Sequence, residues 1–281
     1  MYRLLKNLCL GVLVCLIILL IFYTNLGGYG SKETKTTSHV VGPMFFAHRG
    51  LAQHFPENSH IALEEALKLG INAVEIDVRN TADNQLIVFH DEYCDRLLGL
   101  SSKVESLTLH EIQRRPLLYL KKPSQSKVMT LEEAFDAFHQ QFTYYIDIKI
   151  KGSFVADELA KIIMERKLEN SVIIAHSNIF FIGYLEYFYP QLRTALEGFN
   201  ARDEWTYKMI PKNIKPDYYS SFLKNVDHEH MEWINENDLL TSRIVYGVDS
   251  CNLNTAMSFG LQHIIVDYDT LNVSMRKICD P

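Results

Sequence analysis

Short apolar runs alternate with amphipathic stretches from residue 44 to the end of the chain. The stretches 57–70 and 153–167 carry apolar residues at helical spacing, and repeated alternation of strand and helix is typical of a parallel sheet. About eight strands in one chain favour an α/β fold of the (β/α)8 TIM barrel type over an open sheet. The stretch 91–128 follows the alternation least and is predicted to be an insertion after the third strand. The predicted strands are 44–48, 72–78, 85–90, 143–150, 171–176, 193–198, 217–221, 243–249 and 263–268.

An uncharged apolar segment lies near the start of the chain. No charged residue occurs between Lys6 and Lys32, and the apolar stretch 8–26 has about the length that crosses a bilayer. Arg3 and Lys6 precede it, which by the positive-inside rule leaves the N-terminus in the cytoplasm and the rest of the chain periplasmic, extracellular or lumenal. A cleaved signal peptide is the alternative. We therefore expect a transmembrane anchor over 1–27, a polar linker over 28–42 and a barrel domain over 43–281.

The overall charge excludes some partners. The formal net charge is −6, and the longest basic run in the predicted domain is Lys121-Lys122, so a nucleic-acid partner is not indicated. A negative surface does not attract an anionic substrate either. Any phosphate group must therefore be held by local basic residues or by a metal ion.

Two of the predicted strands carry acids on a single face. Glu75 and Asp77 share one face of the strand 72–78, and Asp147 and Lys149 share one face of the strand 143–150, because side chains alternate along a strand. Carboxylates inside a barrel repel each other and lose hydration, which a cation or basic neighbours can offset. Hard cations such as Mg²⁺ and Ca²⁺ prefer carboxylate oxygens. For Glu75 and Asp77 alone, a solvated edge strand remains the alternative.

Histidines follow two further strands. His48 and Arg49 end the first strand, and His90 and Asp91 end the third, although His90 by itself is compatible with a purely structural role. The carboxyl ends of barrel strands converge on one site. An arginine can bind two phosphate oxygens, and two histidines can act as general acid and general base. This set of groups favours phosphodiester cleavage over acyl transfer, which needs a nucleophile with an oxyanion hole.

The order of these motifs resembles the glycerophosphodiester phosphodiesterase family of TIM-barrel, phospholipase-C-like phosphodiesterases. Each motif is weak alone, but their order and spacing together are specific, and the resemblance extends from Met44 to Tyr268. Weaker matches are YGVD at 246–249 and HIIVDY at 263–268. The matching motifs are HRG at 48–50, PENS at 56–59, EID at 75–77, HD at 90–91 and DIK at 147–149.

The resemblance implies a hydrolase that uses one divalent cation, Mg²⁺ or Ca²⁺, and converts glycerophosphodiesters to glycerol 3-phosphate and an alcohol. It also implies that a neighbouring hydroxyl of the substrate attacks first and forms a cyclic phosphate. Carried over by position, the metal ligands are Glu75, Asp77 and Asp147, the acid–base pair is His48 and His90, and the substrate-binding residues are Arg49, Lys149, Glu57, Asn58 and Tyr246. Glu57 is also a candidate for an additional metal ligand.

One departure from the family pattern affects the substrate prediction. Asp147 stands where the family usually has glutamate, and the shorter side chain changes how an ion would be held. Sphingomyelinase-D-type phospholipases look similar at this point, so cleavage of lysophospholipids is a second hypothesis, which the aromatic stretch 178–190 also motivates. A binding barrel without catalysis is the third, although no histidine or acid of the set is missing.

Overall fold

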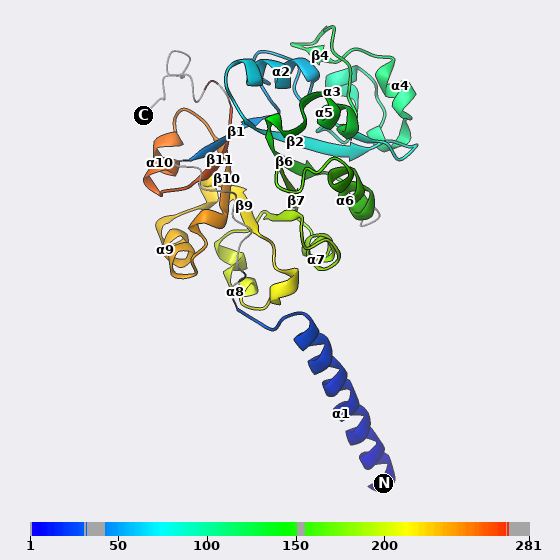
Figure 1. The fold of residues 1–281 in the computed structure, drawn as a ribbon, viewed down its shortest axis with the longest axis vertical. Helices are drawn as coiled ribbons and strands as arrows, with labels where there is room; N and C mark the ends of the chain where they lie inside the picture. The colour runs from blue at the N-terminus through cyan, green and yellow to red at the C-terminus, as the bar shows by residue number, and fades with distance from the viewer. Residues whose placement is uncertain (1, 31, 33–42, 151–154, 268, 270–281) are drawn as a thin grey trace.

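This computed structural model describes residues 2–30, 32, 43–150, 155–267 and 269. Eight parallel strands form a closed barrel, and helices lie around it (Figure 1). Each strand pairs with its neighbours in the sheet, and β1 pairs with both β2 and β11, which closes the sheet on itself. The predicted TIM barrel is therefore confirmed. The barrel strands are β1 (Met44–His48), β2 (Ala73–Asn80), β6 (Thr143–Ile148), β7 (Val172–His176), β8 (Arg193–Glu197), β9 (Tyr218–Phe222), β10 (Arg243–Val248) and β11 (His263–Val266).

One predicted strand lies outside the barrel order. β3 (Leu86–Val88) runs antiparallel to β2, with Val78 opposite Val88 and Asn80 opposite Leu86. We expected His90 at the carboxyl end of a third barrel strand, and this placement was wrong. β2 extends beyond the barrel rim, and β3 returns beside it, so the chain after β3 comes back to the same rim.

Strand alternation divides the core into two layers. One apolar cluster fills the barrel interior and includes Phe46, Tyr145 and Ile244, while the larger cluster lies between the strands and the surrounding helices. Inward and outward residues alternate along each strand, as the pleat requires. The same alternation carries the acids of β2 and β6 to the inner face, above the apolar interior.

Helices cover the outside of the barrel between successive strands. Their buried faces are apolar, as in α6, where Leu159 and Ile163 pack inward. Thr130 begins α5 with a capping box in which Glu133 returns to the backbone of Thr130. The covering helices are α2 (His60–Lys68), α5 (Leu131–Phe138), α6 (Val155–Glu165), α7 (Ile179–Phe188), α8 (Glu204–Tyr207), α9 (His228–Glu236) and α10 (Leu253–Ser258).

The irregular stretch between β3 and α5 has a small core of its own. Cys94, Leu98, Ile112 and Val128 are buried there against Phe89. This is the region that the sequence predicted as an insertion. Its elements are short: α3 (Asp95–Leu98), η1 (Val104–Ser106), α4 (Leu109–Gln113), β4 (Leu118–Tyr119) and β5 (Lys122–Pro123).

The N-terminal helix α1 (Tyr2–Asn25) projects away from the barrel (Figure 1). Its side chains from residue 11 to residue 21 are exposed. Within the described part of the chain, no helix is long and apolar enough to cross a membrane. The transmembrane helix predicted over 1–27 is therefore not supported.

The segment after α1 is bound to the base of the barrel, at the amino ends of the strands. The backbone N–H groups of Lys212 and Asn213 donate to the carbonyls of Gly28 and Leu26, at 2.9 and 3.0 Å. Lys32 forms ion pairs with Glu186 at 2.5 Å and Asp217 at 2.7 Å. We predicted a polar linker over 28–42, and its described beginning contacts the domain. Residues 31 and 33–42 of that linker, and the end of the predicted domain from residue 270, lie outside the described residues.

Candidate active site

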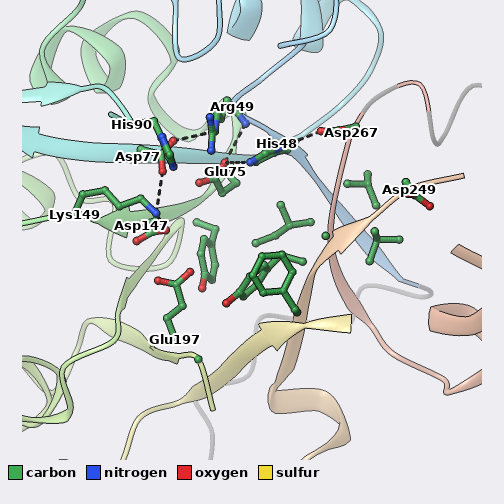
Figure 2. Close-up of a pocket in the computed structure, with 18 of the residues that line it drawn as sticks. His48, Arg49, Glu75, Asp77, His90, Asp147, Lys149, Glu197, Asp249 and Asp267 are labelled. Carbon is green, nitrogen blue, oxygen red and sulfur yellow. Dashed lines mark hydrogen bonds and ion pairs between the residues drawn. The ribbon is translucent and has the colours of Figure 1, made fainter. Parts of the chain in front are cut away.

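A pocket of about 590 Å³ opens at the carboxyl ends of the barrel strands (Figure 2). Most of the predicted site residues line this pocket together, and they come from different strands. Its charged and polar lining includes His48, Arg49, Glu75, Asp77, His90, Asp147, Lys149, Glu197, Tyr246, Asp249 and Asp267. Glu57 and Asn58 contact this lining from behind.

The end of β1 turns sharply to place His48 and Arg49 at the rim. Arg49 has a φ of 54° and Gly50 a φ of 75°, and both values lie in the left-handed region. A Cβ on Gly50 would lie 2.9 Å from the backbone of Ala62, so glycine lets the turn pack against α2. The Arg49 backbone N–H donates to a side-chain oxygen of Glu75 at 3.0 Å. The turn therefore fixes Arg49 against the acid on the neighbouring strand.

The PENS loop supports the same arginine from the other side. Glu57 accepts a hydrogen bond from Nη1 of Arg49 at 2.8 Å, and Asn58 donates from Nδ2 to Asp77 at 2.9 Å. Asn58 is buried and has a φ of 56°. Ser59 then caps α2 by accepting from the backbone N–H of Ala62. Glu57 and Asn58 therefore position charged groups of the pocket.

Three carboxylates meet at the centre of the pocket. Ligand oxygens of Glu75, Asp77 and Asp147 lie within 4.8 Å of one another, and all three residues are buried. Asp77 and Asp147 are direct neighbours in the register between β2 and β6. Glu57 lies outside this cluster and pairs with arginines, so the additional metal-ligand role considered for it is not supported.

Two cations lie against this cluster. Arg49 approaches Asp77 at 3.2 Å, and Lys149 approaches Asp77 at 3.4 Å and also pairs with Asp147. Burial by itself would raise the pKa of Asp77, but Arg49 and Lys149 outweigh it and hold that pKa below its usual value. Asp77 is therefore the carboxylate of the cluster with the strongest ionic support.

The other two acids of the cluster have raised pKa values. Burial, and then the charges of Asp77 and Asp147, raise the pKa of Glu75 well above its ordinary value. Burial also raises the pKa of Asp147 despite its pairing with Lys149. Arg49 and Lys149 do not fully compensate the three carboxylates, and a divalent cation with oxygen ligands would supply further positive charge. The donor set therefore fits such an ion.

β3 runs antiparallel to β2 and so brings His90 back to the pocket. The Phe89 backbone N–H donates to the Asp77 carbonyl at 2.9 Å, and the His90 carbonyl accepts from Nε of Arg79 at 2.7 Å. Nδ1 of His90 lies 2.7 Å from Oδ1 of Asp91. Burial would raise the pKa of Asp91, but Arg96 and His90 hold it below its usual value. An ionised carboxylate only accepts hydrogen bonds, so this contact favours the tautomer with the proton on Nδ1 and leaves Nε2 outside the pair.

Sequence reasoning missed the equivalent partner of His48. Nδ1 of His48 lies 3.0 Å from Oδ1 of Asp267, and Nε2 lies 3.9 Å from Glu75 (Figure 2). The hydrogen bond from His48, with a contribution of opposite sign from burial, leaves the pKa of Asp267 lowered. The motif HIIVDY places an acid after the closing strand, which pairs with β1. The position of this acid, Asp267, is the feature of the sequence from which the partner of His48 could have been predicted.

The far side of the pocket carries Glu197 and Tyr246. Burial, and then the charge of Asp147, raise the pKa of Glu197 to about 8. The Tyr246 ring lies 4.5 Å from the Phe222 ring, and burial followed by the nearby charge of Glu197 raises the pKa of its hydroxyl to about 12. Tyr246 was predicted to bind substrate, and the structure places it in the pocket lining.

The fold and the site together define a (β/α)8 barrel with a cluster of three carboxylates that could hold a cation and two carboxylate-paired histidines at the mouth. Residues 48–182 match the sequence model of the Glycerophosphoryl diester phosphodiesterase family, which confirms the resemblance predicted from the motifs. The "Glycerophosphodiester phosphodiesterase" of Caldanaerobacter subterraneus subsp. tengcongensis is 31% identical over 160 residues, covering 54% of this chain and 65% of that protein. "Glycerophosphodiester phosphodiesterase 1" of Bos taurus is 32% identical over 135 residues, covering 46% of this chain and 40% of that protein. The chain spans less than two thirds of the length of these curated relatives.

Solved structures share the fold at low sequence identity. A phosphodiesterase of Oleispira antarctica, in complex with the product sn-glycerol-3-phosphate, aligns with a TM-score of 0.70 and 19% identity, covering 83% of this chain and 96% of that one. A glycerophosphodiester phosphodiesterase of Thermotoga maritima aligns with a TM-score of 0.68 and 21% identity, covering 85% of this chain and all of that one (100%). These likenesses support the barrel architecture.

Proposed function

We propose that this protein is a metal-dependent phosphodiesterase that hydrolyses glycerophosphodiesters to glycerol 3-phosphate and an alcohol. The observation that carries the proposal is the meeting of two carboxylate-paired histidines, His48 and His90, with a three-carboxylate cluster in one pocket. The names of the curated relatives support the reaction, and the glycerol 3-phosphate in the Oleispira structure supports the product.

Arg49 and Lys149 supply fixed positive charge for the phosphate group. Both side chains line the pocket, and acids hold both in place. Arginine presents paired N–H donors to phosphate oxygens, and lysine acts as a point charge. We propose that the diester phosphate binds between these two residues, with its bridging oxygens directed towards the histidines.

The histidines move the protons of the reaction. In each ring Nδ1 is bonded to an aspartate, so Nε2 can accept or donate a proton. One histidine takes the proton of the attacking hydroxyl as its oxygen bonds to phosphorus. The other gives a proton to the alcohol oxygen as the phosphorus–oxygen bond breaks. If a hydroxyl of the substrate attacks first, water opens the cyclic phosphate with these roles reversed.

Glu75, Asp77 and Asp147 would hold one divalent cation, Mg²⁺ or Ca²⁺. When bound, such an ion neutralises phosphate charge and favours ionisation of a nearby hydroxyl. The raised pKa of Glu75 supports this assignment, because removal of like-charge repulsion is what a bound cation provides. Lys149 and Arg49 would then orient the carboxylates around the ion.

The proposal is tested by assaying the purified protein on glycerophosphocholine, glycerophosphoethanolamine and lysophospholipids, with Mg²⁺, with Ca²⁺ and with EDTA. We expect release of glycerol 3-phosphate that depends on a divalent ion. Absence of metal-dependent turnover on every substrate would refute the proposal. Turnover of lysophospholipids alone would instead favour the lysophospholipase-D-like reaction. His48→Ala and His90→Ala should each abolish turnover without loss of the fold.

We also propose, from the sequence, that the N-terminal segment holds the chain at a membrane with the barrel domain on the non-cytoplasmic side. Arg3 and Lys6 precede the uncharged stretch, and the side chains of residues 11–21 are exposed. Since the described residues include no helix suited to cross a membrane, this attachment needs a separate test. Alkaline carbonate extraction should leave the protein in the membrane pellet, and its recovery in the supernatant would exclude the anchor.

A further inference from the structure

Arg96 bridges two carboxylates behind the pocket. Its Nη1 and Nη2 donate to Glu57 at 2.6 and 2.7 Å, and its Nε and Nη2 donate to Asp91 at 2.6 and 2.9 Å. Two edges of the planar guanidinium group therefore form paired contacts, one with each carboxylate. Arg96 itself lies outside the lining of the pocket, and about half of its side chain is exposed.

Each of these two carboxylates also contacts a residue that has a role in the proposed function. Glu57 holds Nη1 of Arg49 at 2.8 Å, and Asp91 holds Nδ1 of His90 at 2.7 Å. The result is a continuous chain from the proposed phosphate-binding arginine to the proposed acid–base histidine. Its two ends come from different loops, one after β1 and one after β3.

We propose that Arg96 is a positioning residue that fixes Arg49 and His90 relative to each other. The inference rests on the proposed function, because it assigns to Arg96 the alignment of the phosphate site with the proton-transfer group. It also gives the insertion after β3 a role in the reaction. Arg96 lies in α3, and the neighbouring Leu97 and Leu98 are buried in the core of the insertion.

The guanidinium group is suited to this task in a way that lysine is not. Its donors lie in one rigid plane and can form two paired contacts at once, whereas an ammonium group offers rotatable donors around a single point. Mutation of the hydrogen-bond partners of metal ligands typically changes affinity or activity by about 10- to 100-fold, and we expect an effect of similar size for a side chain that orients reacting groups. A displacement of about 1 Å at a reacting group is enough for a loss of this size.

The test compares Arg96→Met and Arg96→Lys with Arg166→Met in the full chain. Arg166 is a matched control, because it also bridges two carboxylates, Asp136 and Glu132, each at 2.7 Å, but lies away from the pocket. We expect Arg96→Met to lower kcat and raise KM for glycerophosphocholine, with kcat/KM reduced about 10- to 100-fold. Arg96→Lys should recover stability in urea but not kcat, and Arg166→Met should leave both kinetic constants within twofold, a bound we set at about the precision of such assays.

A second readout is independent of turnover. Long-range ¹H–¹⁵N spectra of the imidazole groups report the hydrogen bond at Nδ1 of His90, with the signal assigned by its absence in His90→Gln. We expect Arg96→Met to shift this signal and Arg166→Met to leave it in place. An unmoved signal together with unchanged kinetic constants would overturn the positioning role. If the wild-type protein turns over no diester, the proposed function fails, and the spectra still decide whether Arg96 positions His90.

Discussion

Nδ1 of His48 lies 3.0 Å from Oδ1 of Asp267, although 219 positions separate the two residues in the sequence. The contact joins the first barrel strand to the segment after the last one. It repeats the arrangement of His90 with Asp91, so both histidines of the pocket have a carboxylate at the same ring nitrogen. A carboxylate in this position favours one tautomer of the ring and would stabilise the imidazolium form in the proposed proton transfer.

Asp267→Asn should lower kcat strongly while the protein remains folded. An asparagine can present its amide N–H to Nδ1, which favours the wrong tautomer and blocks Nε2 from accepting a proton. We expect a loss in kcat of roughly 100-fold or more, measured on glycerophosphocholine at saturating substrate. Asp269→Asn is the control, since Asp269 pairs with the partly exposed His54 at 2.7 Å. Equal kcat values in the two variants would contradict the assigned role of Asp267.

Removal of one carboxylate of the central cluster should weaken divalent-ion binding. We expect Asp147→Ala to reduce the affinity for Mg²⁺ or Ca²⁺ by at least about 10-fold in calorimetry, because an oxygen donor is lost. Asp147→Glu should retain binding, since it keeps the charge and lengthens the arm by one methylene. Asp249→Asn removes an acid that lines the pocket outside the cluster and serves as the control. Unaltered affinity in Asp147→Ala would exclude Asp147 as a ligand.

Loss of Lys32 should destabilise the base of the barrel. The Lys32 side chain is 15% exposed, and the side chains of its partners Glu186 and Asp217 are 1% and 0% exposed. Water could therefore solvate these two carboxylates only slightly if the lysine were removed. Breaking one side of a buried pair costs about 3–5 kcal/mol, and the partial exposure of Lys32 favours the lower end for Lys32→Met in urea unfolding. Lys161→Met, which removes an exposed lysine 3.9 Å from Glu158, should change stability little. A shortened chain that begins at residue 26 should accordingly unfold at higher urea than one that begins at residue 33.

The barrel should become less stable as the pH decreases, because His263 binds a proton more readily in the unfolded chain than in the folded one. Burial, and then the positive charge of Arg193, lower the pKa of this imidazole from 6.5 to about 4. The unfolded chain therefore binds a proton more readily, so His263 lowers stability as the pH falls from 6.5 towards 4. We expect a contribution of about 2 kcal/mol between pH 7.5 and pH 5. His263→Phe should reduce the pH dependence of the unfolding free energy by this amount, whereas replacement of the exposed His110 by glutamine should not.

Much of the site could be predicted from local patterns. Alternation along a strand places Glu75 and Asp77 on the same face, and the same rule places Asp147 and Lys149 together on β6. About eight barrel strands were expected from the repeated change between apolar runs and amphipathic stretches, and eight of the nine predicted runs are barrel strands, while the run 85–90 is not. These properties depend on neighbours in sequence and on the geometry of one strand, so no knowledge of distant contacts was needed.

The strand that precedes His90 was wrongly predicted to belong to the barrel, for a physical reason. The run 85–90 has the composition of a buried strand, and composition does not reveal whether such a strand runs parallel or antiparallel to its neighbour. The tertiary structure pairs β3 with the extension of β2 beyond the rim, and this return brings His90 beside Asp77. The sequence therefore predicted His90 as a site residue, but it did not predict the direction of the strand that precedes it.

The sequence by itself determined the alternation of strands and helices, the acids that share one face and the charged ends of the strands, because these follow from local patterns along the chain. Only the tertiary structure decided that Asp267 orients His48, that Arg96 joins Glu57 to Asp91, and that Lys32 is held at the base. Hydrogen bonds and ion pairs of this kind are short-range contacts between residues far apart in the chain. They exist only once barrel closure and the folded insertion bring those residues within about 3 Å.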